Sequence, residues 1–277
     1  MRTGFIILLF FIFQCTLHAQ QIDSRILKDK NFLVYTKNGE GFVHDNIPSS
    51  TAAFQKLGRE LNFSVDTTEN PNIFSEEKLK NYDAIIFANT NNDVFDTEAQ
   101  KVAFMRYIQA GGGYIGIHSA TGTERNWKWF KLMMGATFLR HPPLQPYTVH
   151  VLDPVHPTTK NLQQKWDTID ESYYFKEINP SIKVLLYSDL SQVKESGDGK
   201  HTKPDVFGNR YPVAWCHMFD GGKIWYTSLG HSKEDYENPV YLAHIIEGLK
   251  WVADKGKLDY KKSYAISSTE INENEIF

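Results

Sequence analysis

The first half of the chain alternates short apolar runs with longer stretches in which apolar residues recur at a helical period. NFLVYT at 31–36, DAIIFANT at 83–90 and YIGIH at 114–118 are typical of buried strands. Residues 49–61 begin with serines, and residues 96–111 have an acidic first turn and a terminal glycine, so both ranges predict helices. Strands and helices in alternation form a parallel sheet with helices on both faces. We therefore predict an α/β fold with a doubly wound, mostly parallel sheet.

The stretch from about residue 127 to residue 207 departs from this alternation. It contains proline turns after His141 and His156, an alternating YTVHVLD segment and a polar loop, SGDGKHTK, at 196–203. We interpret it as an inserted region of loops and sheet-edge strands over the carboxyl ends of the main strands, and not as a separate domain. KIWYTS at 223–228 then predicts a late strand, and residues 238–254 predict a long amphipathic helix.

The two ends of the chain differ from the part between them. Arg2, the apolar run from Phe5 to Phe13 and a cleavage site after Ala19 indicate a secretory signal peptide at 1–20, too short in its apolar part to span a bilayer. We expect a secreted, periplasmic protein with no membrane anchor after cleavage. Residues 21–256 form the predicted domain, and the polar tail at 257–277 is expected to fray.

Charge and cysteine content exclude some classes of protein. The chain has 30 basic and 33 acidic side chains; loss of Arg2 with the signal leaves 29 against 33, a net charge of −4. This balance does not attract nucleic acid or an anionic membrane surface. Cys15 would leave with the signal, so Cys216 remains without a disulfide partner, and we interpret it as a small buried hydrophobe.

Polar side chains gather where the predicted strands end, which is where open α/β sheets bind their ligands. They are His44 and Asp45, Asn89 and Thr90, His118 and Ser119, and His231, with Asp170, Glu171, Tyr173 and Tyr174 supplied by the inserted region. We expect these three histidines and one carboxylate to lie close together. The remaining candidates favour structural roles: His141 and His156 precede prolines and fix turns, His150 alternates with apolar residues, and Trp127 and Trp129 belong to the core.

The segment Gly116-Ile117-His118-Ser119-Ala120 resembles a nucleophile elbow, a tight strand-to-helix turn that exposes its central side chain. Here the central residue is a histidine, which can transfer protons near neutral pH or bind a metal through a ring nitrogen. The glycines at 111–113 follow a helix and precede a strand. That order is the reverse of a dinucleotide-binding loop, so we interpret them as a helix stop.

Six segments in order, FVHDNIP, GGGYIGIHSA, HPTTKNL, DESYYF, PVAW and GGKIWYTSLGH, resemble the ThuA-like (trehalose utilisation) family from about Asn31 to Lys255. The resemblance implies a flavodoxin-like core related to class I glutamine amidotransferases, with His118 where those enzymes have a cysteine. Glutamine hydrolysis through a thioester is then excluded, because no cysteine stands at the elbow. The resemblance also marks His44, His118, Glu171, His231 and Trp215 as recurring family positions, and it implies trehalose-type and 3-keto sugars as substrates.

These observations favour an exported enzyme, a hydrolase or isomerase, that acts on keto-disaccharides of the trehalose type by acid–base chemistry. The predicted catalytic residues are His118, Glu171 and His231. The predicted substrate-binding residues are His44, Asp45, Asn89, Ser119, Tyr173 and Trp215.

Three alternatives stay open. A divalent metal such as zinc, held by His44, His118 and His231, would assist the same chemistry. A sugar-binding protein without catalytic activity would use the aromatic residues to stack on sugar rings. The sequence also leaves a homo-oligomer open.

Overall fold

The computed structural model describes residues 25–197, 203–204 and 206–271. The predicted signal peptide at 1–20 and most of the polar loop at 196–203 lie outside the described residues. Within the described part, eleven strands form a nine-stranded sheet and a two-stranded sheet. The strands are β1 (Asn31–Tyr35), β2 (Ser64–Thr68), β3 (Ala84–Ala88), β4 (Gly113–Ile117), β5 (Thr137–Arg140), β6 (Gln145–Val151), β7 (Lys165–Asp170), β8 (Tyr174–Lys176), β9 (Lys183–Asp189), β10 (Arg210–Phe219) and β11 (Gly222–Thr227).

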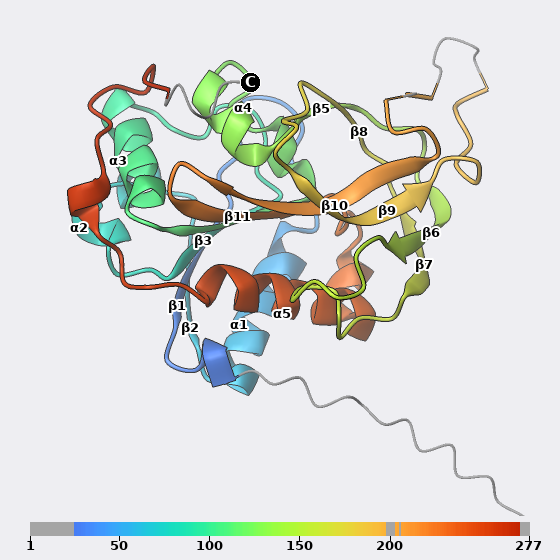
Figure 1. The fold of residues 1–277 in the computed structure, drawn as a ribbon, viewed down its shortest axis with the longest axis horizontal. Helices are drawn as coiled ribbons and strands as arrows, with labels where there is room; N and C mark the ends of the chain where they lie inside the picture. The colour runs from blue at the N-terminus through green and yellow to red at the C-terminus, as the bar shows by residue number, and fades with distance from the viewer. Residues whose placement is uncertain (1–24, 198–202, 205, 272–277) are drawn as a thin grey trace, which may run out of the picture.

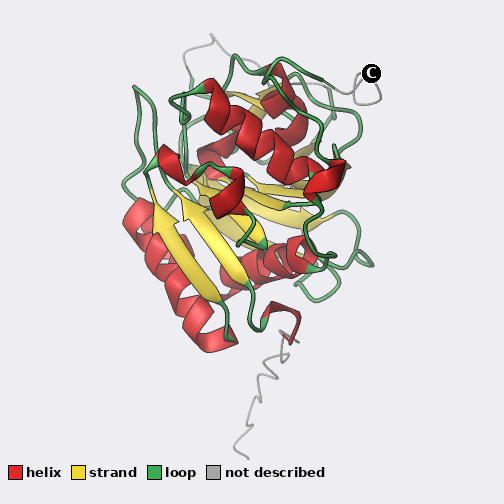
Figure 2. Ribbon diagram, turned by 90° about the vertical axis from the view of Figure 1, so that its left-hand side faces the viewer, coloured by secondary structure: helices red, strands yellow, loops and turns green. Residues whose placement is uncertain are grey.

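Helices cover both faces of the nine-stranded sheet, as the sequence predicts (Figure 1). In that view, α5 lies below β11 and β10, and α4 lies above them; the turned view shows the strands enclosed between helices (Figure 2). The helices are α1 (Ile47–Leu61), α2 (Glu76–Leu79), α3 (Glu98–Gln109), α4 (Lys128–Met134) and α5 (Pro239–Ala253). Strands β3 and β4 are wholly buried between these layers, which explains their nearly continuous apolar sequences.

The sheet has a parallel half and an antiparallel half, in the order β2-β1-β3-β4-β11-β10-β9-β6-β7. Strands β2, β1, β3, β4 and β11 pair in parallel, which confirms the doubly wound core. Strands β10, β9, β6 and β7 extend the same sheet with antiparallel pairs. The inserted region therefore does supply sheet-edge strands, and its β5 and β8 pair separately.

The helix boundaries follow the capping residues. A capping box between Thr97 and Gln100 begins α3, and Gly111, with φ of 92°, follows its end, so the predicted helix stop is confirmed. Helix α1 corrects the prediction of a serine cap at residue 49. It begins at Ile47 after the N-cap Asn46, because Pro48 has the fixed φ that the first helical turn accepts.

The predicted fraying of the tail is wrong as far as residue 271. A short 3₁₀ helix, η5 (Tyr260–Lys262), is followed by Ala265, which is buried and whose backbone N–H donates to Gln109 Oε1 at 3.0 Å. The hydroxyl of Ser268 donates to Glu98 Oε2 at 2.7 Å, and its carbonyl accepts from Trp127 Nε1 at 2.8 Å. The tail stays ordered because α3 and Trp127, the residue before α4, provide partners for its polar groups.

Cys216 is buried in β10, as expected, and burial raises the pKa of its thiol to about 12. A thiol in such surroundings stays protonated and unreactive at neutral pH. Among the residues that the structure describes, no helix is both long and apolar enough to cross a membrane.

Candidate metal centre

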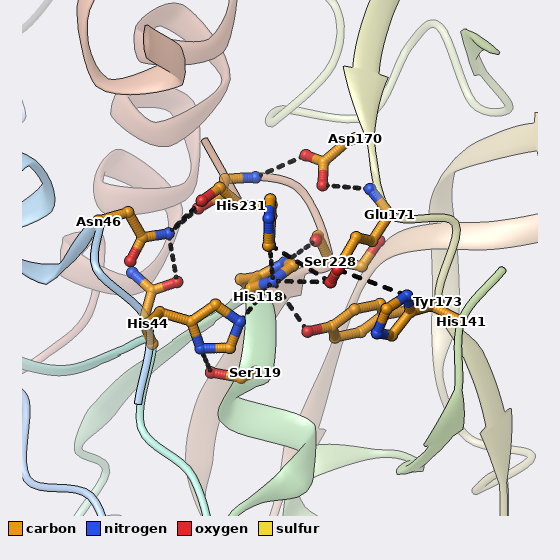
Figure 3. A network of polar contacts seen from close by, with 12 residues as sticks. His44, Asn46, His118, Ser119, His141, Asp170, Glu171, Tyr173, Ser228 and His231 are labelled. Carbon is orange, nitrogen blue, oxygen red and sulfur yellow. Dashed lines mark hydrogen bonds and ion pairs between the residues drawn. The ribbon is translucent and has the colours of Figure 1, made fainter. Parts of the chain in front are cut away.

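The loops that follow four strands meet at one edge of the sheet (Figure 3). Because β1, β3, β4 and β11 are adjacent and parallel, their carboxyl ends lie together. This arrangement brings His44 from the loop after β1, His118 from the end of β4 and His231 from the loop after β11 into contact. Glu171, which follows β7, reaches the same place from the inserted region.

His118 occupies a strained turn, as the elbow-like sequence predicts, but its side chain is buried and not exposed. Its φ is 50°, in the left-handed region, and the 3₁₀ helix η3 (His118–Gly122) begins there directly after β4. Gly116 permits the tight packing, because a Cβ at this position would lie 2.8 Å from Met134 Cε. Left-handed geometry at a residue other than glycine costs about 1–3 kcal/mol, and such strain gathers at functional sites.

The hydrogen bonds of His118 determine which ring nitrogen is free to act. Its Nδ1 lies 2.7 Å from the Ser228 carbonyl oxygen, which only accepts, so Nδ1 carries the proton. The Tyr173 hydroxyl oxygen lies 2.8 Å from Nε2, the nitrogen that carries the lone pair. The ring is fully buried. The unprotonated Nε2 therefore faces the other histidines, as it does in a metal-binding imidazole whose other nitrogen is anchored to the backbone.

Four potential ligand atoms surround one point. His118 Nε2 lies 3.1 Å from His44 Nε2 and 3.3 Å from His231 Nδ1. Glu171 Oε2 lies 3.3 Å from His231 Nδ1 and 3.5 Å from His118 Nε2. All four atoms lie within 4.8 Å of one another.

These distances and this donor set suit a metal ion. Zinc bonds of about 2.0–2.1 Å in tetrahedral geometry place neighbouring ligand atoms roughly 3.3 Å apart, close to the spacings given above. Imidazole nitrogen and carboxylate oxygen are ligands that zinc and related divalent metals prefer. The predicted ligands His44, His118 and His231 thus come together, and Glu171 completes the set.

Neighbouring side chains orient two of the ligands. His44 Nδ1 lies 3.3 Å from Ser119 Oγ, so a proton on Nδ1 leaves Nε2 unprotonated toward the cluster. Glu171 Oε1 lies 3.4 Å from His141 Nδ1 while its other oxygen faces the histidines.

The charge states of the cluster follow from burial and mutual contact. Burial, and then the neighbouring histidines, lower the pKa of His44 to about 3, and burial also lowers the pKa of His118. Burial alone would raise the pKa of Glu171, but hydrogen bonds with its histidine partners outweigh it and hold the pKa below its ordinary value. The hydrogen bond with Glu171 raises the pKa of His231. Among the three imidazoles, His231 is therefore the one that keeps a proton to the highest pH.

Buried polar groups hold the loops in place around the cluster. Asn46 Nδ2 lies 2.7 Å from the carbonyl oxygens of both Gly230 and His231 and 3.2 Å from Asn89 Oδ1. Asp170 accepts from the backbone N–H groups of Gly230 and Glu171 at 2.9 and 2.7 Å. The inserted region is thereby tied to the loop after β11.

A pocket of about 330 Å³ opens beside the cluster, near the lower end of the range for small-molecule sites. His44 and Glu171 belong to both the pocket and the cluster, whereas His118 lies buried beneath it. The residues that line the pocket are Phe42, His44, Asn91, Ser119, Gly122, Arg125, Phe138, His141, Glu171 and Tyr173.

Three residues predicted to bind substrate do not line this pocket, and the structure corrects their roles. The side chain of Asp45 is 82% exposed and pairs with Lys233 at 2.7 Å, because it points outward from its loop. Asn89 is fully buried, and its Oδ1 accepts a hydrogen bond from Asn46 in the network that holds the loops in place. Trp215 is fully buried, with its indole N–H bonded to the Met134 carbonyl at 2.8 Å, so no face of the ring is free to stack on a sugar.

The sequence interpretation missed three residues at the site. His141, for which the sequence favours a turn over a ligand role, lines the pocket and approaches Glu171. Asn46 directly follows the predicted His44 and Asp45 within FVHDNIP, and Arg125 follows Ser119 by six residues and belongs to none of the quoted segments. The structural interpretations of His156, which contacts Cys216 Sγ at 3.7 Å, and His150, which stacks on Tyr187, agree with their positions away from the pocket.

Fold and site together define an α/β protein with a histidine-rich centre at the carboxyl ends of a mostly parallel sheet. The model of the ThuA family, described as trehalose utilisation, matches residues 31–252, and the chain belongs to this family. Its sheet has the glutamine amidotransferase-like arrangement expected of that family.

Solved structures agree with this assignment. A ThuA-like protein from Bacteroides uniformis has 26% identity and a TM-score of 0.65, over 81% of this chain and 91% of the other. A second from Parabacteroides merdae, at 18% identity and the same TM-score, covers 83% of this chain and 92% of its own, and shows the shared fold. No curated protein matches the chain in sequence.

Proposed function

We propose that this protein is a metal-dependent enzyme that acts on keto-disaccharides of the trehalose type. The observation that carries the proposal is the convergence of three imidazole nitrogens and one carboxylate oxygen beside a pocket that His44 and Glu171 line. Membership of a family described as trehalose utilisation supports a sugar as the substrate class. The sequence at 1–20 supports export to the periplasm as part of the same proposal.

His44, His118, His231 and Glu171 would hold the ion. A divalent ion held there would act as a Lewis acid on a carbonyl oxygen that adds to the four protein ligands. His118 is assigned to this role and not to direct proton transfer with substrate, because its ring is fully buried beneath the pocket. This assignment differs from the acid–base role that the sequence predicts for it.

His141 is the group best situated to accept a proton from a substrate. Its Nδ1 lies 2.9 Å from the Pro142 carbonyl oxygen and donates to it, so Nε2 of the neutral ring carries a lone pair. The side chain lines the pocket beside Glu171 and Tyr173. A ketone acidifies the neighbouring C–H, and removal of that proton lets the glycosidic oxygen leave without an oxocarbenium ion. The departing oxygen takes up the proton that His141 accepted, and addition of water to the C=C bond that the elimination leaves completes hydrolysis.

The first experiment separates metal binding from proton transfer. The His141→Gln variant should retain zinc but lose at least about a hundredfold in turnover of 3-keto-trehalose, the effect typical of a lost general base. Stripping the metal from the wild-type protein should abolish turnover, and adding zinc back should restore it. His150→Gln, which changes a histidine stacked on Tyr187 away from the pocket, is the matched control.

Full turnover after the metal has been stripped would contradict the proposal. Binding of the keto-sugar by the zinc-loaded wild-type protein with no product formed would favour the alternative, a sugar-binding protein without catalytic activity.

A further inference from the structure

Arg125 lines the pocket but has no acidic partner among the described residues. Its Nε donates to the Gly122 carbonyl at 2.9 Å, and its Nη2 donates to Asn91 Oδ1 at 3.2 Å. The guanidinium carbon also lies 5.6 Å from the centre of the Phe138 ring, over its face. A cation held on three sides by neutral groups retains its full charge toward the pocket.

The surroundings of Arg125 are built to hold it. Asn91 is buried, and its Nδ2 donates to the Phe42 carbonyl at 3.3 Å while Oδ1 accepts from Arg125. Gly122 leaves room for this contact, because a Cβ there would lie 2.6 Å from Asn91 Oδ1 and 2.9 Å from Arg125 Nη2. These contacts hold the guanidinium at the wall of the pocket, although Arg125 as a whole is exposed to solvent.

The pocket consequently has a surplus of positive charge. Glu171 supplies one negative charge, and a divalent ion at the histidine cluster together with Arg125 would supply three positive charges. A fixed, unpaired guanidinium in a pocket is the arrangement that recognises carboxylates and other oxyanions in two-pronged hydrogen bonds. Phe42, Phe138 and Tyr173 supply apolar wall area on which the face of a sugar ring can pack.

We propose that Arg125 is a specificity-determining residue that binds the carboxylate of an acidic sugar unit. The preferred substrates are then keto-sugars that carry a uronic acid, with the carboxylate at Arg125 and the carbonyl toward the histidine cluster. The contact between the carbonyl and the histidine cluster rests on the proposed function. The contact between the carboxylate and Arg125 adds the class of substrate that the pocket selects.

The test measures binding and does not depend on turnover. Titration calorimetry on the zinc-loaded protein compares D-glucuronate with D-glucose, for the wild type, Arg125→Gln and Arg125→Lys. We expect the wild type to prefer glucuronate by about tenfold or more, which is the effect of one charge-assisted hydrogen bond. Arg125→Gln should remove the preference, and Arg125→Lys should restore only part of it, because an ammonium lacks the planar fork.

The control variant is Lys128→Gln, which removes a nearby exposed charge that does not line the pocket. It should leave the preference unchanged. The proposal is overturned if the wild type binds both sugars equally or binds neither, or if Arg125→Gln keeps the preference. Zinc content of the same samples reports on the proposed function separately, since Arg125 is not a ligand.

Discussion

At the scale of single residues, the site depends on the backbone of His118. A residue with φ of 50° is strained unless it is glycine, so replacement by glycine and by alanine should differ in stability although both remove the imidazole. We predict that His118→Gly unfolds with a free energy about 1 kcal/mol higher than that of His118→Ala. Urea denaturation measures the difference.

The control is a helical position, where the glycine variant should be less stable than the alanine variant. Gln55 is an exposed residue within α1, where glycine is less favourable than alanine by about 0.5–1 kcal/mol. Gln55→Gly should therefore be less stable than Gln55→Ala. If His118→Gly were likewise less stable than His118→Ala, the left-handed turn at the end of β4 would be refuted.

The protonation of His231 makes metal binding dependent on pH. The hydrogen bond with Glu171 raises its pKa, so the nitrogen that must bind the ion keeps its proton to higher pH than in a free histidine. We predict that zinc affinity rises with pH, by up to about tenfold per pH unit, until His231 has lost its proton, and that binding releases protons over the same pH range. Calorimetry in buffers of different ionisation enthalpy counts these protons. Affinity independent of pH would contradict the assignment.

At the scale of elements, the loops after β1 and β11 are joined through Asn46. Its side-chain amide donates hydrogen bonds to two carbonyl oxygens. In Asn46→Ala these oxygens lose a buried donor, which should lower the unfolding free energy by roughly 1–3 kcal/mol. Asn46→Asp should cost more, because it places another acceptor against these oxygens. Equal stability of the two variants in urea denaturation would show that the amide does not donate there.

The tail is the second element with a testable role. A chain that ends at Lys262 loses the contacts of Ser263, Ala265 and Ser268 with α3 and the loop around Trp127. We predict a fall in melting temperature on the order of 5 °C, with zinc binding unchanged because these contacts lie away from the ligands. An unchanged melting temperature would indicate that the tail adds no stability.

At the scale of the whole molecule, the alternation of strands and helices was sufficient to predict the parallel half of the sheet. The carboxyl-end rule likewise predicted that His44, His118 and His231 meet, because β1, β4 and β11 belong to one run of parallel strands, β1-β3-β4-β11. Other details depend on the direction of side chains in loops, which no periodic pattern records. Asp45 and Asn46 are adjacent, yet one points into solvent and the other into the network.

Long-range packing accounts for the remaining differences. Trp215 faces the core because its indole N–H donates to the carbonyl oxygen of Met134, the last residue of α4. His141 and Arg125 reach the pocket from irregular segments, whose course depends on tertiary contacts and not on local sequence preference.

The most direct test of the account is the zinc content of the purified protein after loading and extensive dialysis. Elemental analysis should find about one zinc ion per chain in the wild type and essentially none in His118→Gly, measured on folded protein. A wild type that retains no zinc, or a variant that retains as much as the wild type, would contradict the assignment of the four-residue cluster as a metal centre.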